Sequence, residues 1–312
     1  MTSSDDGKGK IAAMWEFLFG DKKGLIPEET MVTEKSDLKS IPEEEDTVVW
    51  LGHSSFFMQL HEEKILVDPV FKDYASPVSF VNKAFKGSNV YKPEDMPDID
   101  VLVISHDHWD HLDYDTVKAL KDRVKEVVCP LGIGAYLEQW GYPAEKIHEE
   151  DWGGKVHIGD DLLIYVFPAQ HFSGRSLTEN PTLWASFAFF TPERKVYYTG
   201  DSCYGSHFKE IGDTFGPFDL ALVECGQYNK GWRYIHMMPE ESAKAAEDLH
   251  ARAVIPVHNG KFALSRHTWD DPYRRIEEAA KGKHFVLMTP EIGEKSELDY
   301  LHPLPEWWKE MK

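Results

Sequence analysis

Short apolar runs recur along the chain from residue 47 onward, and most of them have the length of a β-strand. The first three cover residues 47–51, 55–60 and 64–67, and residues 101–104 form an unbroken Val-Leu-Val-Ile run that stops at Ser105. An unbroken apolar run of this length predicts a buried strand. Further strands are predicted at 126–129, 161–167, 184–191, 195–199, 220–224, 253–257 and 285–288.

Helical segments fit between the predicted strands. The clearest covers about 239–250 and starts with Pro-Glu-Glu, because proline suits the first turn and acidic side chains favour the positive end of the helix dipole. Others are predicted at about 132–140 and 271–281, and one more begins at Asp113 or Asp115 as its N-cap. Strands and helices that mix in two successive halves predict an α/β (α+β) fold with two mixed β-sheets face to face and helices outside.

Residues 1–45 differ from the rest and are predicted to form an N-terminal extension, followed by a single domain over 46–312. The extension is mostly polar, but residues 11–19 place apolar side chains on one helix face. We expect this short amphipathic helix to pack on the main body or on a partner subunit of a homo-oligomer. Lysines on both sides of its aromatic residues leave contact with a membrane surface as the alternative.

Composition sets limits on the class of protein. The 312 residues carry a net charge of −20, and no Lys/Arg-rich run offsets it, so nucleic acid is not an expected partner. Three cysteines are too few for a disulfide framework or a thiolate metal site. The sequence has no stretch of about 20 apolar residues and no signal-peptide pattern, which predicts a cytoplasmic protein.

The strongest chemical signal is the run His-Asp-His-Trp-Asp-His at residues 106–111, directly after the predicted buried strand 101–104. A strand end holds short side chains rigidly at the mouth of a sheet, where ligand atoms converge. Imidazole nitrogens and carboxylate oxygens suit zinc, manganese or iron better than calcium or magnesium. A single ion that keeps an open position cannot use all of these groups, so further ligands are expected from other strand ends. His171, Asp201 and His258 each follow a predicted strand and are the candidates.

This pattern resembles the metallo-β-lactamase superfamily over roughly residues 47–290. The matching motifs are His106-x-His108-x-Asp110-His111, then His171, Gly200-Asp201 and His258. The resemblance implies a four-layer αββα sandwich and two divalent metal ions. It implies His106, His108 and His171 as ligands of one ion, Asp110, His111 and His258 as ligands of the other, and Asp201 as a bridge.

Shorter motifs are similar to one branch of that superfamily, which contains N-acyl-phosphatidylethanolamine phospholipase D and is related to ascorbate-6-phosphate lactonase. They are Gly-His-Ser-Ser at 52–55, Asp68-Pro69, Gln-His-Phe-Ser-Gly-Arg at 170–175 and His-Met-Met-Pro-Glu-Glu at 236–241. The branch implies a small or lipid-like anionic substrate.

The expected reaction is attack on a phosphodiester by a hydroxide bridging two metal ions, with zinc as the first choice of metal and manganese or iron as the others. Asp110 is the candidate for orienting the nucleophile, and His236 for polarising the substrate or protonating the leaving group. Five further residues are candidates for supporting a metal ligand or binding substrate: His53, Asp68, Gln170, Arg175 and Lys261.

Two other functions stay open from the sequence. A lactonase, or a hydrolase of phosphorylated sugars or other esters, would use the same hydroxide, so the motifs do not separate it from a phosphodiesterase. A metal-binding regulatory protein without turnover would keep the ligands and show no hydrolysis.

Overall fold

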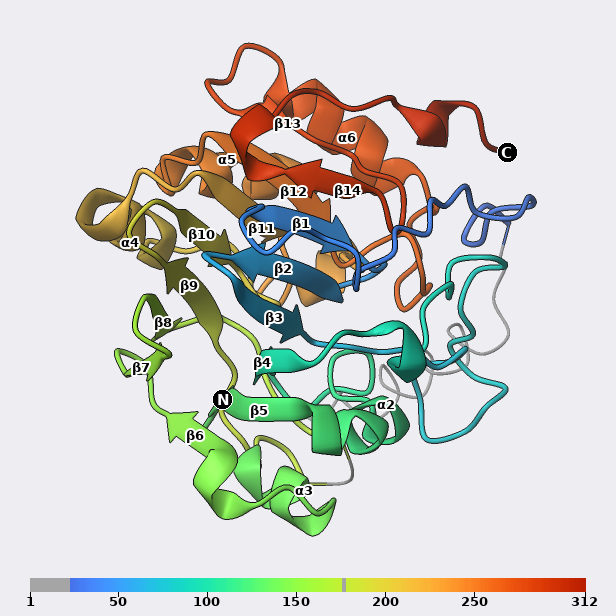
Figure 1. Ribbon diagram of the computed structural model, residues 1–312. Helices are drawn as coiled ribbons and strands as arrows, with labels where there is room; N and C mark the ends of the chain where they lie inside the picture. Colours follow the sequence, from blue (N-terminus) through green and yellow to red (C-terminus); the bar gives the residue numbers. More distant parts are fainter. Residues whose placement is uncertain (1–22, 176–177) are drawn as a thin grey trace, which may run out of the picture.

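The computed structural model describes residues 23–175 and 178–312, and its strands form two seven-stranded sheets (Figure 1). The first sheet contains, in spatial order, β14 (Lys295–Glu297), β1 (Thr47–Trp50), β2 (Phe56–Leu60), β3 (Glu63–Val67), β4 (Ile99–Val103), β5 (Val124–Pro130) and β6 (Ile147–Glu150). The second contains β13 (Val286–Leu287), β12 (Ala253–Val257), β11 (Leu220–Glu224), β10 (Lys195–Tyr198), β9 (Ser186–Phe190), β8 (Leu162–Phe167) and β7 (Lys155–Ile158).

Helices cover the outer face of each sheet and complete four layers. The first sheet is covered by α2 (Tyr114–Leu120) and α3 (Gly134–Gln139), and the second by α4 (His207–Phe215), α5 (Pro239–Asp248) and α6 (Asp271–Ala280) (Figure 1). Short 3-10 helices lie at Pro93–Asp95, Lys121–Arg123, Ala144–Lys146, Lys230–Trp232, Leu298–Tyr300 and Trp307–Lys309. The predicted αββα sandwich is confirmed.

Alternation along the central strands explains how both faces of a sheet are buried. In β4, Val101 and Val103 belong to the core between the two sheets, whereas Leu102 packs with Val117 and Leu120 of α2 on the outer side. Successive side chains of a strand point to opposite faces. An unbroken apolar run therefore serves two cores, and each fully buried aliphatic side chain contributes about 1.5–3 kcal/mol of burial free energy.

The described part of the N-terminal extension lies on the main body. Met31 and Leu38 are buried, and the backbone of Glu34 donates to Ile292 over 3.0 Å. The predicted helix at 11–19 lies outside the described residues, and the division at residue 45 stays a prediction. No helix within 23–175 and 178–312 combines the length and the apolar character needed to cross a bilayer.

Replacing Gly293 with alanine is expected to loosen this contact. Gly293 has a φ of 90°, and a Cβ there would lie 1.9 Å from the carbonyl oxygen of Glu34. We expect the free energy of unfolding to fall by about 1–3 kcal/mol, the cost of overpacking. Gly282→Ala is the matched control, because its φ of 77° carries the same backbone strain with no atom within 4 Å of the added methyl. Urea unfolding checks the pair, and equal losses would contradict the contact.

Candidate metal centre

Strand direction gathers the predicted site residues at one edge of the sandwich. β3 and β4 run parallel, and β1 runs in their direction because it is antiparallel to β2, which is antiparallel to β3. The same reasoning gives β8, β10, β11 and β12 one common direction in the second sheet. The residues that follow these strands are His53 (β1), Asp68 (β3), 106–111 (β4), His171 (β8), Asp201 (β10) and His258 (β12).

One group of potential ligands consists of His106, His108, His171 and Asp201, whose ligand atoms lie within 4.8 Å of one another. The Nε2 atoms of His106 and His171 approach Nδ1 of His108 to 2.9 Å and 3.2 Å. Three imidazole nitrogens therefore converge on one point, next to a carboxylate.

A second group, also within 4.8 Å, consists of His53, Asp110, His111 and His258. Nε2 of His53 lies 2.8 Å from Oδ2 of Asp110, and Nε2 of His111 lies 3.4 Å from the same oxygen. Asp201 lies between the two groups, because its carboxylate is 3.6 Å from His171 Nε2 in the first and 3.2 Å from His258 Nδ1 in the second.

Asp68 fixes the ring of His111 from behind. Its Oδ2 accepts from Nδ1 of His111 over 2.8 Å, from the Ser105 hydroxyl over 2.6 Å and from the Tyr198 hydroxyl over 2.7 Å. Oδ1 accepts from the Ser105 backbone over 2.7 Å. Because Tyr198 belongs to the second sheet, one buried carboxylate joins both sheets and leaves Nε2 of His111 directed into the site. This is the arrangement by which outer partners orient metal ligands.

The other rings are held in a similar way. Nδ1 of His171 donates to the carbonyl of Ile235 over 2.9 Å, Nδ1 of His106 lies 2.9 Å from the Ser105 hydroxyl, and Nδ1 of His258 lies 3.0 Å from the Ser54 hydroxyl. Ser54 and Ser105 were not predicted as site residues. Their signal is position alone, since each adjoins a candidate histidine at a strand end.

Burial and charge make the site suitable for binding positive ions. Burial lowers the pKa of His106, His171 and His258 well below its ordinary value, so their ring nitrogens keep free lone pairs. Burial alone would raise the pKa of Asp201, but the adjacent His111 and His258 outweigh it and hold the pKa well below its usual range. His106, His171 and His258 are therefore neutral rings around an ionised carboxylate. Burial alone would lower the pKa of His111, but Asp201 and Asp110 outweigh it and raise that pKa well above its ordinary value.

The donor set fits a divalent cation. Among the described residues, Nε2 of His258, Nε2 of His111 and Oδ1 of Asp201 are buried and have no hydrogen-bond partner. A buried polar atom without a partner costs about 1–3 kcal/mol, which a bound cation offsets. Mixed nitrogen and oxygen donors without thiolates suit zinc and its transition-metal neighbours. The clusters can thus hold metal, and the number and identity of the ions stay predictions.

Backbone strain is concentrated at this edge. His53, Asp68 and His258 have φ values of 56°, 41° and 66°, a left-handed conformation that is uncommon for residues other than glycine. His53 and His258 are locked together, because His258 donates its backbone N–H to His53, and His53 donates to Asn259, each over 2.9 Å. Strain of this kind costs about 1–3 kcal/mol per residue and persists where the surrounding structure enforces it.

The sequence did not single out Glu224, the last residue of β11. Its Oε1 contacts Nδ1 of His236 in a short hydrogen bond, and its Oε2 accepts from the Ser202 backbone over 2.6 Å. Burial raises the pKa of Glu224 to about 8, and the pKa of His236 is also raised, because Glu224 outweighs the effect of burial on the ring. The pair therefore retains a shared proton at neutral pH. His236 also lies with Asp201 and His258 in a third group of close ligand atoms.

Arg175 holds the 106–111 loop in place. Its guanidinium donates to the carbonyls of Asp107 and Leu112 and stacks on the Trp109 ring at 3.9 Å. The neighbouring Gly174 donates its backbone N–H to Asp107 over 2.7 Å. These contacts give Arg175 a structural role, whereas its predicted role in substrate binding stays a prediction.

Gln170 and Lys261, both predicted to support the site, differ in burial. Gln170 is exposed beside His171 and accepts from the Cys203 thiol over 2.7 Å. Lys261 is 0% exposed, and its ammonium donates to the carbonyl of Val70 and to the Asn89 side chain over 2.7 Å and 2.9 Å. The Lys261 ammonium therefore faces the protein interior.

Lys261 is expected to make stability depend on pH. Burial lowers its pKa from 10.5 to about 7, so between these values the unfolded chain binds a proton that the folded chain does not. Stability then rises with pH in this interval. Compared with Lys261→Met, the unaltered chain should gain unfolding free energy as the pH is raised from about 7 to 10.5. Urea unfolding at several pH values measures the difference, and a constant difference would contradict the buried lysine.

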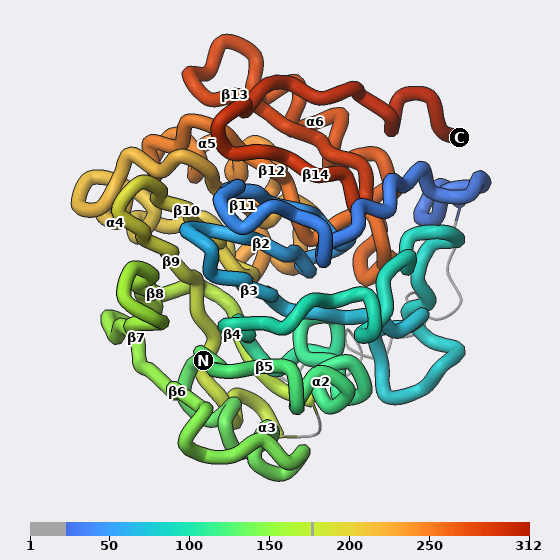
Figure 2. Tube along the Cα trace, in the orientation of Figure 1, coloured from blue at the N-terminus to red at the C-terminus, as the bar shows by residue number. Residues whose placement is uncertain are grey.

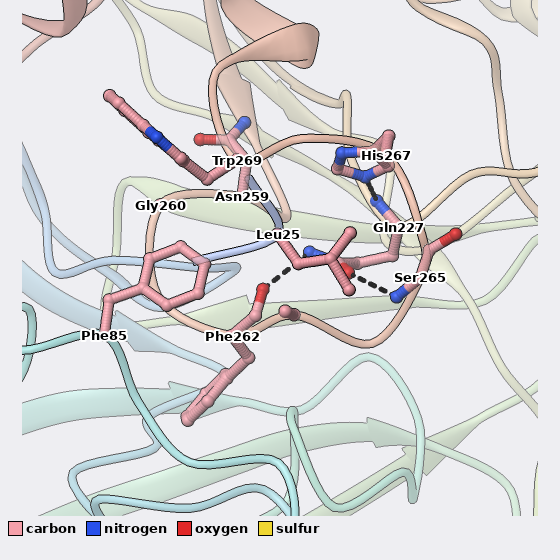
Figure 3. Close-up of a pocket in the computed structure, with 10 residues that line it drawn as sticks. Leu25, Phe85, Gln227, Asn259, Gly260, Phe262, Ser265, His267 and Trp269 are labelled. Atoms are coloured by element: carbon pink, nitrogen blue, oxygen red, sulfur yellow. Dashed lines mark hydrogen bonds between the residues drawn. The ribbon is translucent and has the colours of Figure 1, made fainter. Parts of the chain in front are cut away.

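A small cavity lies behind the His258 segment (Figure 3). Gln227 organises it, because its side chain donates to the carbonyl of Phe262 over 2.9 Å and accepts from the backbone of Ser265 over 3.1 Å, while its own N–H donates to His267 over 2.8 Å. The volume of about 10 Å³ is room for one water molecule at most. The cavity is therefore part of the scaffold of this loop and is too small for a substrate.

Two sheets with outer helices and a His/Asp cluster at one edge define a metal-binding αββα protein. Comparisons with known proteins agree. The family model described as "Beta-lactamase superfamily domain" matches residues 63–259. An uncharacterized protein of Mycobacterium tuberculosis is 40% identical over 266 residues, which cover 84% of this chain and 71% of the relative. N-acyl-phosphatidylethanolamine-hydrolyzing phospholipase D 1 of Caenorhabditis elegans is 36% identical over 262 residues, covering 78% and 74%.

A solved structure shares the fold at lower identity. The metallo hydrolase Igni18 of Ignicoccus hospitalis aligns with a TM-score of 0.60 and 21% identity, over 81% of this chain and 97% of its own. The chain belongs to the metallo-β-lactamase superfamily, as the motifs of the sequence predicted. Family membership and the His/Asp clusters together support a metal-dependent hydrolase.

Proposed function

We propose that this chain is a phosphodiesterase that hydrolyses a phospholipid-like substrate with two divalent metal ions, zinc being the first choice. The observation that carries the proposal is the pair of ligand groups that meet at Asp201, with the Glu224–His236 pair beside them. The similarity to the phospholipase D of Caenorhabditis elegans, which extends over 78% of the chain, supports the choice of bond.

We assign the candidate ligands to two ions. The proposed ligands are His106, His108 and His171 for one ion, Asp110, His111 and His258 for the other, and Asp201 for both. When bound, such ions lower the pKa of a water molecule and neutralise charge that develops on phosphate oxygens.

Asp110 is positioned to orient the attacking water. Burial alone would raise the pKa of Asp110, but His111 and His53 outweigh it and hold the pKa well below its usual range. Its carboxylate thus stays ionised and acts as a hydrogen-bond acceptor. Because Nε2 of His53 occupies one side of Oδ2 over 2.8 Å, His53 fixes the direction in which Asp110 accepts.

His236 is the proposed donor of a proton to the leaving group. Glu224 binds Nδ1, so the proton available to substrate is the one at Nε2. The His236 ring is buried among the candidate ligands, with its centre 5.1 Å from the ring of His171 and 5.2 Å from that of His258. A positioned acid of this kind contributes about 10²–10⁴-fold to rate.

Two cations in the segment that precedes His236 suit an anionic substrate. A groove of about 490 Å³ is lined by Lys230 and Arg233 together with Met238 and two glutamates. Neither cation forms a salt bridge with the part of the chain that the structure describes. The backbone of His236 donates to Trp232 over 3.0 Å, which ties this segment to the proposed acid.

The test is hydrolysis by zinc-loaded protein of a generic phosphodiester, a glycerophospholipid and a panel of lactones and phosphorylated sugars. We expect turnover of the phosphodiesters, with the lactones and sugar phosphates at least tenfold slower in kcat/KM. Turnover of lactones alone would contradict the proposed bond, and the absence of turnover in metal-loaded protein would favour a regulatory metal protein.

A further inference from the structure

The long connection between β3 and β4 carries a hairpin-like projection at residues 74–83. It runs along the right-hand side of the molecule, away from both sheets (Figures 1 and 2). Tyr74 and Lys83 form an antiparallel bridge, and the backbone of Ala75 donates to Asn82 over 3.0 Å. These contacts close the base of the projection and leave residues 76–81 as its tip.

The tip is ordered and yet apolar. The Ser76 hydroxyl accepts from the Val78 backbone over 3.2 Å and donates to the carbonyl of Val81 over 3.2 Å. These bonds direct neighbouring apolar side chains outward: Phe80 is 75% exposed, Val78 is 41% exposed, and Pro77 between the turn and Val78 is also exposed. Single exposed apolar residues are ordinary, but a grouped and fixed set indicates an interaction site.

The residues of the projection carry positive charge, although Asp73 adjoins its base. Residues 74–92 contain three lysines and no acidic residue, whereas the chain has a net charge of −20. Lys83 and Lys86 are exposed, and neither forms a salt bridge within residues 23–175 and 178–312. A partner with negative charge next to an apolar phase therefore matches this surface.

The projection is fastened to the segment that follows His258. Phe85 donates its backbone N–H to the carbonyl of Lys261 over 2.7 Å, and the Lys261 ammonium binds the carbonyl of Val70 on the other side. Val70 and Ala75 pack with Phe262 in a small apolar cluster of their own. The tip therefore has a fixed position relative to the candidate metal centre.

We propose that residues 76–86 form a docking surface for an anionic lipid bilayer, with Phe80 and Val78 entering the interface and Lys83 and Lys86 meeting lipid phosphates. Apolar side chains flanked by lysines bind the boundary between headgroups and acyl chains. A stable protein partner buries about 800 Å² on each side, which a narrow tip does not offer. The proposed surface consists of residues 76–86 and not of residues 11–19, and its binding does not depend on which bond the metal centre cleaves.

The experiment is sedimentation of the full chain with vesicles of phosphatidylcholine alone and of phosphatidylcholine mixed equally with phosphatidylglycerol, with EDTA present to prevent turnover. We expect binding to the mixed vesicles only. Phe80→Ser should weaken binding roughly tenfold. Each of Lys83→Ala and Lys86→Ala should weaken it about fivefold. Tyr300→Ser is the matched control, because Tyr300 is an aromatic residue 70% exposed on another part of the chain.

Equal binding of the Phe80→Ser variant and the unaltered chain would overturn the proposal, as would the absence of binding to mixed vesicles. Self-association that Phe80→Ser abolishes, in protein that does not sediment with vesicles, would overturn it in favour of contact between two copies. Thermal unfolding of each variant confirms that the fold is intact. Loss of hydrolysis in the substrate panel would leave the vesicle result unchanged, so the two proposals fail separately.

Discussion

Replacing Asp201 with alanine is expected to reduce kcat by at least about a thousandfold, because the change removes the carboxylate that contacts both ligand groups. Asp201 lies within 3.2–3.6 Å of ring nitrogens of His258, His111 and His171. Without it, neutral and cationic rings would face one another with no anion between them. Both metal positions should therefore lose affinity together.

The measurement is metal content per chain alongside hydrolysis of a phosphodiester. Asp100→Ala is the matched control, because Asp100 is also a buried carboxylate but lies in β4 at the opposite edge, where it accepts from the backbone of Lys64 over 2.8 Å. Asp100→Ala should lower stability and keep metal and activity. Full metal content in the Asp201→Ala variant would show that the ligand assignment is wrong.

Replacing His236 with glutamine is expected to lower kcat by about 10²-fold or more while metal content and KM stay close to those of the unaltered chain. The physical reason is the loss of the proton at Nε2, because Glu224 contacts Nδ1 and does not replace this proton. Glu224→Gln keeps the shape of the side chain but removes the charge that raises the pKa of His236, so a smaller loss of about tenfold is expected.

The double variant tests whether Glu224 and His236 act together in catalysis or have independent structural roles. If Glu224 acts only through His236, the Glu224→Gln and His236→Gln changes together should cost no more than His236→Gln alone. His250→Gln, at an exposed histidine, is the control and should leave kcat unchanged. Additive losses in the double variant, or loss of metal in either single variant, would contradict a proton-donating pair.

The buried strands could be predicted from the sequence because their apolar runs are unbroken. The bounds of β11 and β12 agree with the predicted 220–224 and 253–257. Three strands were missed: β6 has two glutamates among four residues, β7 alternates exposed and buried positions over four residues, and β14 is Lys-Ser-Glu. β6, β7 and β14 each lie at the edge of a sheet. An edge strand is defined by its pairing with one neighbour more than by hydrophobic burial, so the apolar pattern of the sequence did not predict these strands.

The helix α4 was also missed, although it is amphipathic. Its nine residues include Gly212, which lowers intrinsic helix propensity. The glycine is required by packing, since a Cβ there would lie 1.9 Å from the carbonyl oxygen of Asp248 in α5. The low helix propensity of Gly212 is therefore outweighed by the packing of α4 against α5, a contact that forms only in the folded chain.

The candidate ligands could be named from the sequence because each follows a strand and carries a metal-binding side chain. Glu224 also ends a strand, yet it gave no signal because its role depends on His236, which lies 12 residues further along the chain. Lys261 differs from Glu224, because the sequence did single it out. Its nearness to His258 in sequence predicted a substrate contact, but the folded chain directs its ammonium to Val70 and Asn89.

The most direct test of a two-metal site is the number of zinc ions bound per folded chain, measured by elemental analysis after loading and removal of excess metal. Two ligand groups that share Asp201 predict two ions per chain, and one ion in His108→Ala, whose lost ring belongs to the first group alone. A single ion per unaltered chain, or unchanged content in His108→Ala, would contradict the shared two-metal centre.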